Sequence, residues 1–167
     1  MKSILKVIDS ISEWSGKIVS FAVIAFALVI LYEVFARYIF NAPTTWALEI
    51  SQALYGAWLM LVGAYILWMG AHVNVDVVYA RFPPRTKAIV NSFTWLIFFM
   101  WVGVMVWKGW EMGWFSLMEG EREPTSFGCP VYPTKLCIPV GASLLFLQGL
   151  AGYIRNATFA ITGREAE

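Results

Sequence analysis

Four long apolar blocks without a charged residue limit the fold of this chain more than any other feature. They are residues 18–32, 50–71, 88–107 and 136–154. A helix needs about 20 mostly apolar residues to cross a bilayer, and backbone in lipid must satisfy its hydrogen bonds internally. The whole chain is 59% hydrophobic and 14% charged, whereas soluble domains are about 25% charged. The sequence therefore predicts an all-α integral membrane protein with four transmembrane helices.

The predicted spans belong to one membrane domain that covers the whole chain. They lie at about residues 18–40, 46–71, 86–114 and 134–156. The first span is predicted to continue beyond its uncharged block, so that it includes Glu33 and Arg37. The third is expected to continue beyond the membrane edge, because Trp110, Trp114 and Met118 recur every four residues on one helix face.

The distribution of lysine and arginine predicts the orientation. Eight basic residues lie in the N-terminal segment, the loop between spans two and three and the C-terminal segment, and four lie near the other two loops. Cytoplasmic loops carry the excess of basic residues, so both termini are expected in the cytoplasm and the loops at 41–49 and 115–135 outside. Residues 3–18 have apolar residues at helical spacing. They are predicted to form an amphipathic helix on the membrane surface, and the alternative is an extension of the first span.

Glu33 is the acidic residue nearest the interior of a span. Coupled transporters use acidic residues within the membrane, but Glu33 lies four residues before Arg37 on the same helix face, which favours an ion pair. After the first span, Thr44 or Thr45 is expected to cap the second helix. The tight connection would also bring Arg37 and Glu49 to a similar depth, where a bridge between them could join the two spans.

Other polar residues give weaker signals. His72 and Asp76 are spaced to hydrogen-bond on one helix face, and a contact of this kind is favoured over a pH-sensing role. Cys129 and Cys137 could form a disulfide outside the cell, or remain separate thiols. With one histidine and two cysteines, no metal site or bis-histidine haem is expected, and no other cofactor is indicated. The scattered basic residues do not suggest a nucleic-acid partner.

Three groups of residues resemble the small membrane subunit of tripartite ATP-independent periplasmic (TRAP) transporters, the DctQ-like family. The first and most specific group is Arg37, Tyr38, Phe40, Asn41, Pro43, Trp46 and Glu49. The second is His72, Val75, Asp76, Phe82 and Pro83. The third is Pro133, Pro139, Gly141, Leu144, Leu145 and Gln148. The resemblance covers almost the whole chain, and the segment around Cys129, together with Cys137, departs from it.

This resemblance implies a non-enzymatic protein of the bacterial inner membrane in a three-part system. A periplasmic binding protein would deliver an organic acid, and a large permease subunit would move it inward with sodium. The small subunit would be a scaffold that forms a heterodimer with the large one, in contact with the lipid bilayer, and the binding protein would dock on its outer face. Arg37, Asn41, Trp46 and Glu49 would shape that face, and His72 and Asp76 would order the cytoplasmic loop.

The residues themselves agree with a scaffold, because the uncharged span interiors offer no coupling group. Small residues of the second span suit packing on another membrane protein. They are Gly56, Ala57, Gly63 and Ala64. The alternative is a self-sufficient four-helix exporter coupled to protons through Glu33. A third possibility, the membrane anchor of a respiratory enzyme, is disfavoured by the single histidine. The transported substrate cannot be derived from this chain.

Overall fold

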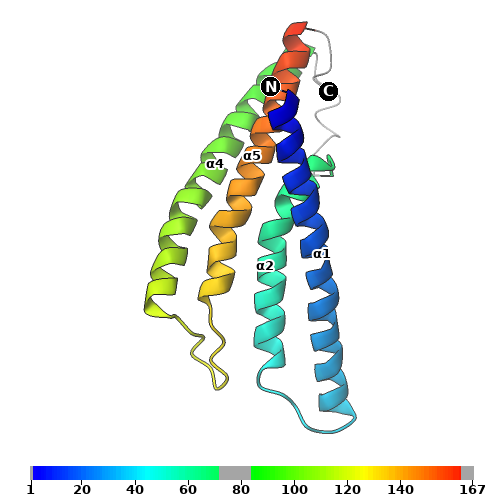
Figure 1. Ribbon diagram of the computed structural model, residues 1–167, viewed down its shortest axis with the longest axis vertical. Helices are drawn as coiled ribbons and strands as arrows, with labels where there is room; N and C mark the ends of the chain where they lie inside the picture. Colours follow the sequence, from blue (N-terminus) through cyan, green and yellow to red (C-terminus); the bar gives the residue numbers. More distant parts are fainter. Residues whose placement is uncertain (1, 72–83, 163–167) are drawn as a thin grey trace.

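The computed structural model describes residues 2–71 and 84–162, and this part of the chain is almost entirely helical (Figure 1). The helices are α1 (Lys2–Tyr38), α2 (Ala47–Trp68), α4 (Pro84–Glu119) and α5 (Tyr132–Thr162). Each contains a segment long and apolar enough to cross a membrane. The predicted all-α fold with four spanning helices is therefore confirmed.

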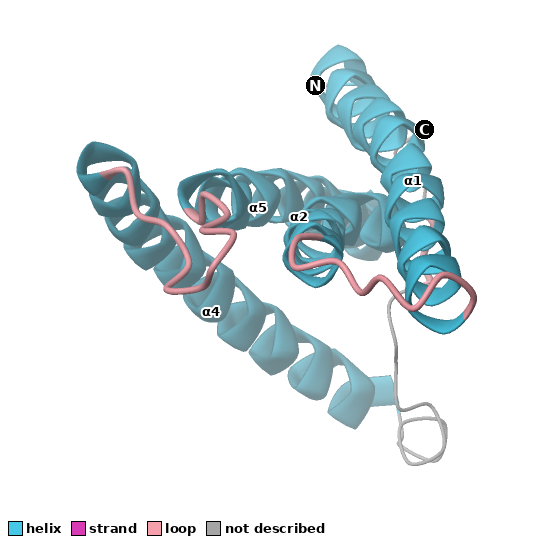
Figure 2. Ribbon diagram, turned by 90° about the horizontal axis from the view of Figure 1, so that it is seen from below, coloured by secondary structure: helices cyan, strands magenta, loops and turns pink. Residues whose placement is uncertain are grey.

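The four helices stand side by side in a row in the order α4, α5, α2, α1 (Figure 2). The centre of the row is α5 against α2; α4 packs on α5, and α1 packs along α2 and, less extensively, on α5. The connection at residues 39–46 and the loop at residues 120–131 lie at one end, called here the loop end, and the start of α1 lies at the opposite end (Figure 1).

The first helix differs from the prediction of a separate surface helix before the first span. It is continuous over 37 residues, which corresponds to about 55 Å at about 1.5 Å per residue. No proline interrupts it, and Gly16 lets α1 approach the Tyr65 ring of α2 so closely that a Cβ would overlap the ring. The first turns therefore extend the axis of the span, and their position relative to the membrane surface stays a prediction.

The helices of the third and fourth spans are longer than the predicted spans. Helix α4 extends to Glu119, and where the membrane edge crosses it stays a prediction. It begins at Pro84, and proline is well suited to the first turn of a helix, where its missing N–H is not needed. Pro139 lies inside α5 and is fully buried.

Small residues form the contact between the two central helices. Ala64, Ala142 and Ala151 are buried, and Gly141 approaches the backbone of Met60 so closely that a Cβ would lie 2.7 Å from the Met60 carbonyl carbon. Such close approach of backbones is how helices pack in membranes.

Three of the four small residues singled out in the second span are engaged within the chain, and contact of this span with a partner stays a prediction. A Cβ on Gly56 would lie 3.2 Å from Thr134, and one on Gly63 would lie 3.9 Å from Leu145, both on α5. Ala64 has no exposed surface. Large apolar side chains instead cover the outside of the row, including Phe21 and Leu28 of α1 and Trp101 and Trp107 of α4.

Candidate functional site

The candidate site is the surface at the loop end, where most of the residues singled out from the sequence lie. It consists of the turn at residues 39–46, between α1 and α2, and the loop at residues 120–131, called here the hairpin. The hairpin contains an antiparallel bridge between Arg122 and Pro130. The N–H of Glu123 donates to the carbonyl of Cys129 at 2.9 Å, and that of Val131 to the carbonyl of Glu121 at 3.0 Å.

Asn41, three residues after the end of α1 at Tyr38, adopts a left-handed backbone conformation with a φ of 51°. Asparagine tolerates this conformation better than most residues other than glycine. The N–H of Ala42 then donates to the carbonyl of Ala36 at 2.9 Å, a bond across six residues that folds the chain back onto the end of α1. Asn41 therefore gives the turn its direction, and Pro43 follows where a helix could not continue.

Glu33 holds the turn against the last turns of α1. Arg37 donates from Nε and Nη2 to Glu33 Oε1 at 3.0 and 2.5 Å, which is the ion pair favoured from the spacing. The other oxygen, Oε2, accepts the backbone N–H of Thr44 at 3.1 Å and also its hydroxyl. Glu33 is thus engaged through both oxygens and joins α1 to the chain that leads into α2.

The predicted cap by Thr44 or Thr45 is wrong. The N-cap of α2 is Trp46, with no side-chain hydrogen bond to the helix, because the Thr44 hydroxyl already binds Glu33. The Trp46 ring instead stacks on Tyr32 of α1, with 5.7 Å between ring centroids. The turn is therefore fixed to α1 by a polar contact and an aromatic one.

Glu49 joins α2 to the hairpin. The predicted salt bridge between Glu49 and Arg37 is not among the ion pairs of the described residues, where Arg37 pairs with Glu33. Glu49 Oε2 accepts the backbone N–H of Cys129 at 3.1 Å. Arg37 instead pairs with Glu33, one helical turn earlier on the same helix, so this ion pair forms without any contact between α1 and α2. A small cavity of about 180 Å³ lies beside this contact and is lined in part by Glu49, Glu123 and Thr134.

A second ion pair holds the hairpin to the start of α5. Lys135 Nζ lies 2.5 Å from Glu121 Oε2. The hydrogen bond from the Lys135 ammonium lowers the pKa of the Glu121 carboxyl below its usual value. Arg122 supports the same loop by donating to the carbonyl of Gly128 at 3.2 Å. The charges of the hairpin thus serve to hold its own shape.

The remaining sequence candidates do not form a site. Cys129 and Cys137 are both free thiols, so the possible disulfide is not seen; Cys129 lies in the hairpin and Cys137 inside α5. His72 and Asp76 lie outside the described residues. Within residues 2–71 and 84–162, histidine, cysteine and acidic side chains do not gather into a group of three or more that could bind a metal.

Sequence reasoning missed a polar cluster at the opposite end, called here the latch. Gln148 of α5 is only 3% exposed. It accepts from the Ser12 hydroxyl at 2.9 Å and donates to Asp9 at 3.2 Å. Arg155 forms an ion pair with the same Asp9. The latch ties the first turns of α1 to the last turns of α5, and a buried glutamine in an apolar span was the signal in the sequence that could have found it.

Comparison with known proteins adds a family to this geometry. A model of the family described as tripartite ATP-independent periplasmic transporters, DctQ component, matches residues 26–159. The chain is also similar to the C4-dicarboxylate TRAP transporter small permease protein DctQ of Vibrio cholerae serotype O1. The two are 27% identical over 181 residues, which cover 93% of this chain and 73% of the relative.

Proposed function

Since the chain belongs to the family of DctQ components of tripartite ATP-independent periplasmic transporters, we propose that it is the scaffold on which the large permease subunit is held. Components of this family are parts of transporters and not enzymes. The chain is accordingly a small permease subunit, a multi-pass protein of the inner membrane with four spanning helices.

The position of the charges carries the scaffold proposal. Along the four described spans, charged side chains lie toward the helix ends, and the middle of the row is built of alanine, glycine and larger apolar residues. Transport pathways at the bilayer midplane commonly use broken helices and ionisable residues. The four helices described here are continuous through their spans, so the path for a substrate is assigned to another subunit.

The proposal also assigns the two ends of the row. The loop end faces the periplasm, as the distribution of basic residues predicts, and both termini face the cytoplasm. The turn and the hairpin then form part of the surface on which a substrate-loaded binding protein docks. Arg37, Asn41, Trp46 and Glu49 act by fixing this surface, because each holds the turn or joins it to a neighbouring segment.

The substrate class follows from the relative and not from this chain. The Vibrio cholerae relative is named for C4-dicarboxylates. An organic acid anion is therefore the expected cargo, selected by the binding protein and the large subunit, and its uptake with sodium is what the family resemblance implies.

Reconstitution tests the scaffold role. Proteoliposomes that contain this chain alone should accumulate no dicarboxylate, with or without a sodium gradient and the binding protein. Vesicles that also contain the large subunit and receive the binding protein outside should accumulate it when sodium is high outside. Accumulation by this chain alone would refute the proposal, and so would full uptake by the large subunit without this chain.

The self-sufficient exporter is not favoured. Its coupling group would be Glu33, which lies five residues from the end of α1 and is engaged by Arg37 and Thr44. Under the scaffold proposal, Glu33→Gln lowers the amount of assembled complex and leaves the uptake per assembled complex unchanged. A fully assembled Glu33→Gln complex without transport would support a coupling role instead.

A further inference from the structure

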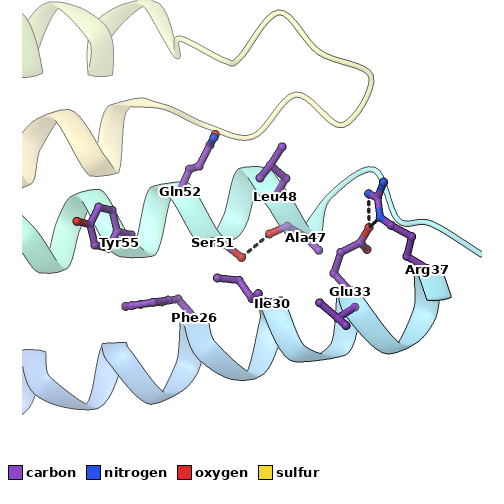
Figure 3. A pocket seen from close by; sticks show the side chains of 10 residues that line it. Phe26, Ile30, Glu33, Arg37, Ala47, Leu48, Ser51, Gln52 and Tyr55 are labelled. Carbon is purple, nitrogen blue, oxygen red and sulfur yellow. Dashed lines mark hydrogen bonds and ion pairs between the residues drawn. The ribbon is translucent and has the colours of Figure 1, made fainter. Parts of the chain in front are cut away.

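We propose that the groove between α1 and α2 binds one phospholipid, with an acyl chain along the groove and the lipid phosphate at Arg37. The groove opens in the half of the row nearest the loop end (Figure 3) and has a volume of about 350 Å³. Its lining is apolar over most of its length, with side chains such as Phe26, Ile30 and Leu48, and the charged pair Glu33 and Arg37 lies at one end. A long apolar cavity with a partly exposed guanidinium and its paired carboxylate at one end matches the shape of an amphiphile.

The length of the groove matches one leaflet of a bilayer. From Phe26 to Arg37 the groove follows α1 for eleven residues, which is about 16 Å at about 1.5 Å per residue. The hydrocarbon core of a membrane is about 30 Å thick, so one leaflet is about 15 Å deep. An acyl chain parallel to α1 would therefore fill the groove and place its headgroup beside Arg37.

The walls of the groove are not covered by the chain's own fold. Ile30 is 48% exposed and Leu48 is 66% exposed, although both lie in membrane-spanning helices. Apolar surface at this depth is stable against hydrocarbon and costly against water.

Arg37 has hydrogen-bonding capacity left for a phosphate. Its side chain is 53% exposed. Nε and Nη2 donate to Glu33, while Nη1 donates to no residue of the described chain. A guanidinium binds phosphate oxygens well, and often with two parallel hydrogen bonds. Glu33 keeps the guanidinium at the end of the groove, so the anion and the acyl chain can be bound together.

Photo-crosslinking of lipids to the full-length chain in nanodiscs tests the site. The probes are phosphatidylethanolamine and phosphatidylglycerol, each with a diazirine on one acyl chain, and a diacylglycerol with the same label but no phosphate. Both phospholipids should attach to peptides from residues 26–37 and 47–55, and the diacylglycerol should attach several-fold less. Equal labelling by the diacylglycerol, or equal labelling of all exposed helix faces, would overturn the proposal.

Two pairs of matched variants locate the lipid. Ile30→Trp fills the groove and should reduce labelling there several-fold, whereas Ile24→Trp changes an exposed residue of α1 outside the groove and should not. Arg37→Gln should reduce phospholipid labelling to the level of the diacylglycerol. Lys108→Gln removes an exposed, paired cation on α4 and should leave labelling unchanged. A groove variant that labels like its control would count against the site.

The same experiment distinguishes the lipid from a protein occupant. Crosslinking is repeated in inner-membrane vesicles that contain the assembled transporter. Labelling of the groove should persist there, and its loss on assembly would show that a partner side chain occupies the groove, which overturns the lipid assignment. This result does not depend on the scaffold role, because binding of the large subunit is measured separately by co-purification.

Discussion

Replacing Gly141 with alanine should loosen the central contact of the row. A Cβ on Gly141 would lie 2.7 Å from the Met60 carbonyl carbon, whereas ordinary van der Waals contact begins at 3.4 Å. Because the obstructing atoms are backbone and the Met60 carbonyl oxygen is nearer still than the carbon, the two helices α2 and α5 must separate by at least about 1 Å. A gap of about 1 Å removes about half of the attraction between facing atoms, and about 40 such pairs at about 0.1–0.2 kcal/mol each then lose roughly 2–4 kcal/mol.

The matched control is Gly103→Ala on α4, where a Cβ would meet nothing within 4 Å. Alanine is the better helix former by about 0.5–1 kcal/mol, so this variant should be as stable as the parent or slightly more so. Unfolding of the purified full-length chains in mixed micelles, followed by tryptophan fluorescence, gives both free energies. The reasoning is refuted if Gly141→Ala unfolds like the parent, or if both variants lose the same stability.

Three further predictions follow from the polar contacts. Gln148→Leu removes two hydrogen bonds from α5 to α1 and should cost about 1–3 kcal/mol of unfolding free energy, whereas Gln52→Leu on the exposed side of α2 should cost little in the same assay. The ion pair of Glu121 and Lys135 should stabilise the hairpin fully at pH values above about 4.3, the ordinary pKa of glutamate. This stabilisation should be lost as the pH falls through the lowered pKa of Glu121. Protection of the hairpin amides from exchange, relative to their intrinsic rates at each pH, should therefore fall only below about pH 4, and Glu121→Gln should abolish that dependence. Cys129 and Cys137 should both be alkylated in the unfolded chain without any reductant, which mass spectrometry would detect as two added groups. Alkylation that occurs only after a reductant is added would reveal a disulfide and contradict the structure.

The spans could be predicted from the sequence because a bilayer imposes length and apolarity on each segment separately. The pairing of Glu33 with Arg37 could also be derived, since residues four apart meet on any helix. Both inferences are local and need no knowledge of how the helices are arranged. The same is true of the length of α4, because Trp110, Trp114 and Met118 keep the helical spacing up to the end of that helix.

Contacts between distant segments could not be derived in this way. The partner of Glu49 is a backbone N–H 80 positions away, and Ser12 meets Gln148 across 136 positions. Similar depth made Arg37 a plausible partner for Glu49, but depth does not determine which side chains face each other. The sequence also does not show that α5 lies beside Gly56 and Gly63 of α2, so their small size alone suggests a partner protein.

The arrangement of the helices in a row has a mechanical consequence. In a closed bundle every helix is supported by several neighbours, whereas α4 is supported along its length mainly by α5, and α1 packs on both α2 and α5. A tilt of α4 about its contact with α5 would therefore leave the contacts of α1 in place. The latch and the turn fasten α1 at its two ends, which makes the α1 edge of the row the stiffer one and leaves the α4 edge to adapt in shape to whatever lies against it.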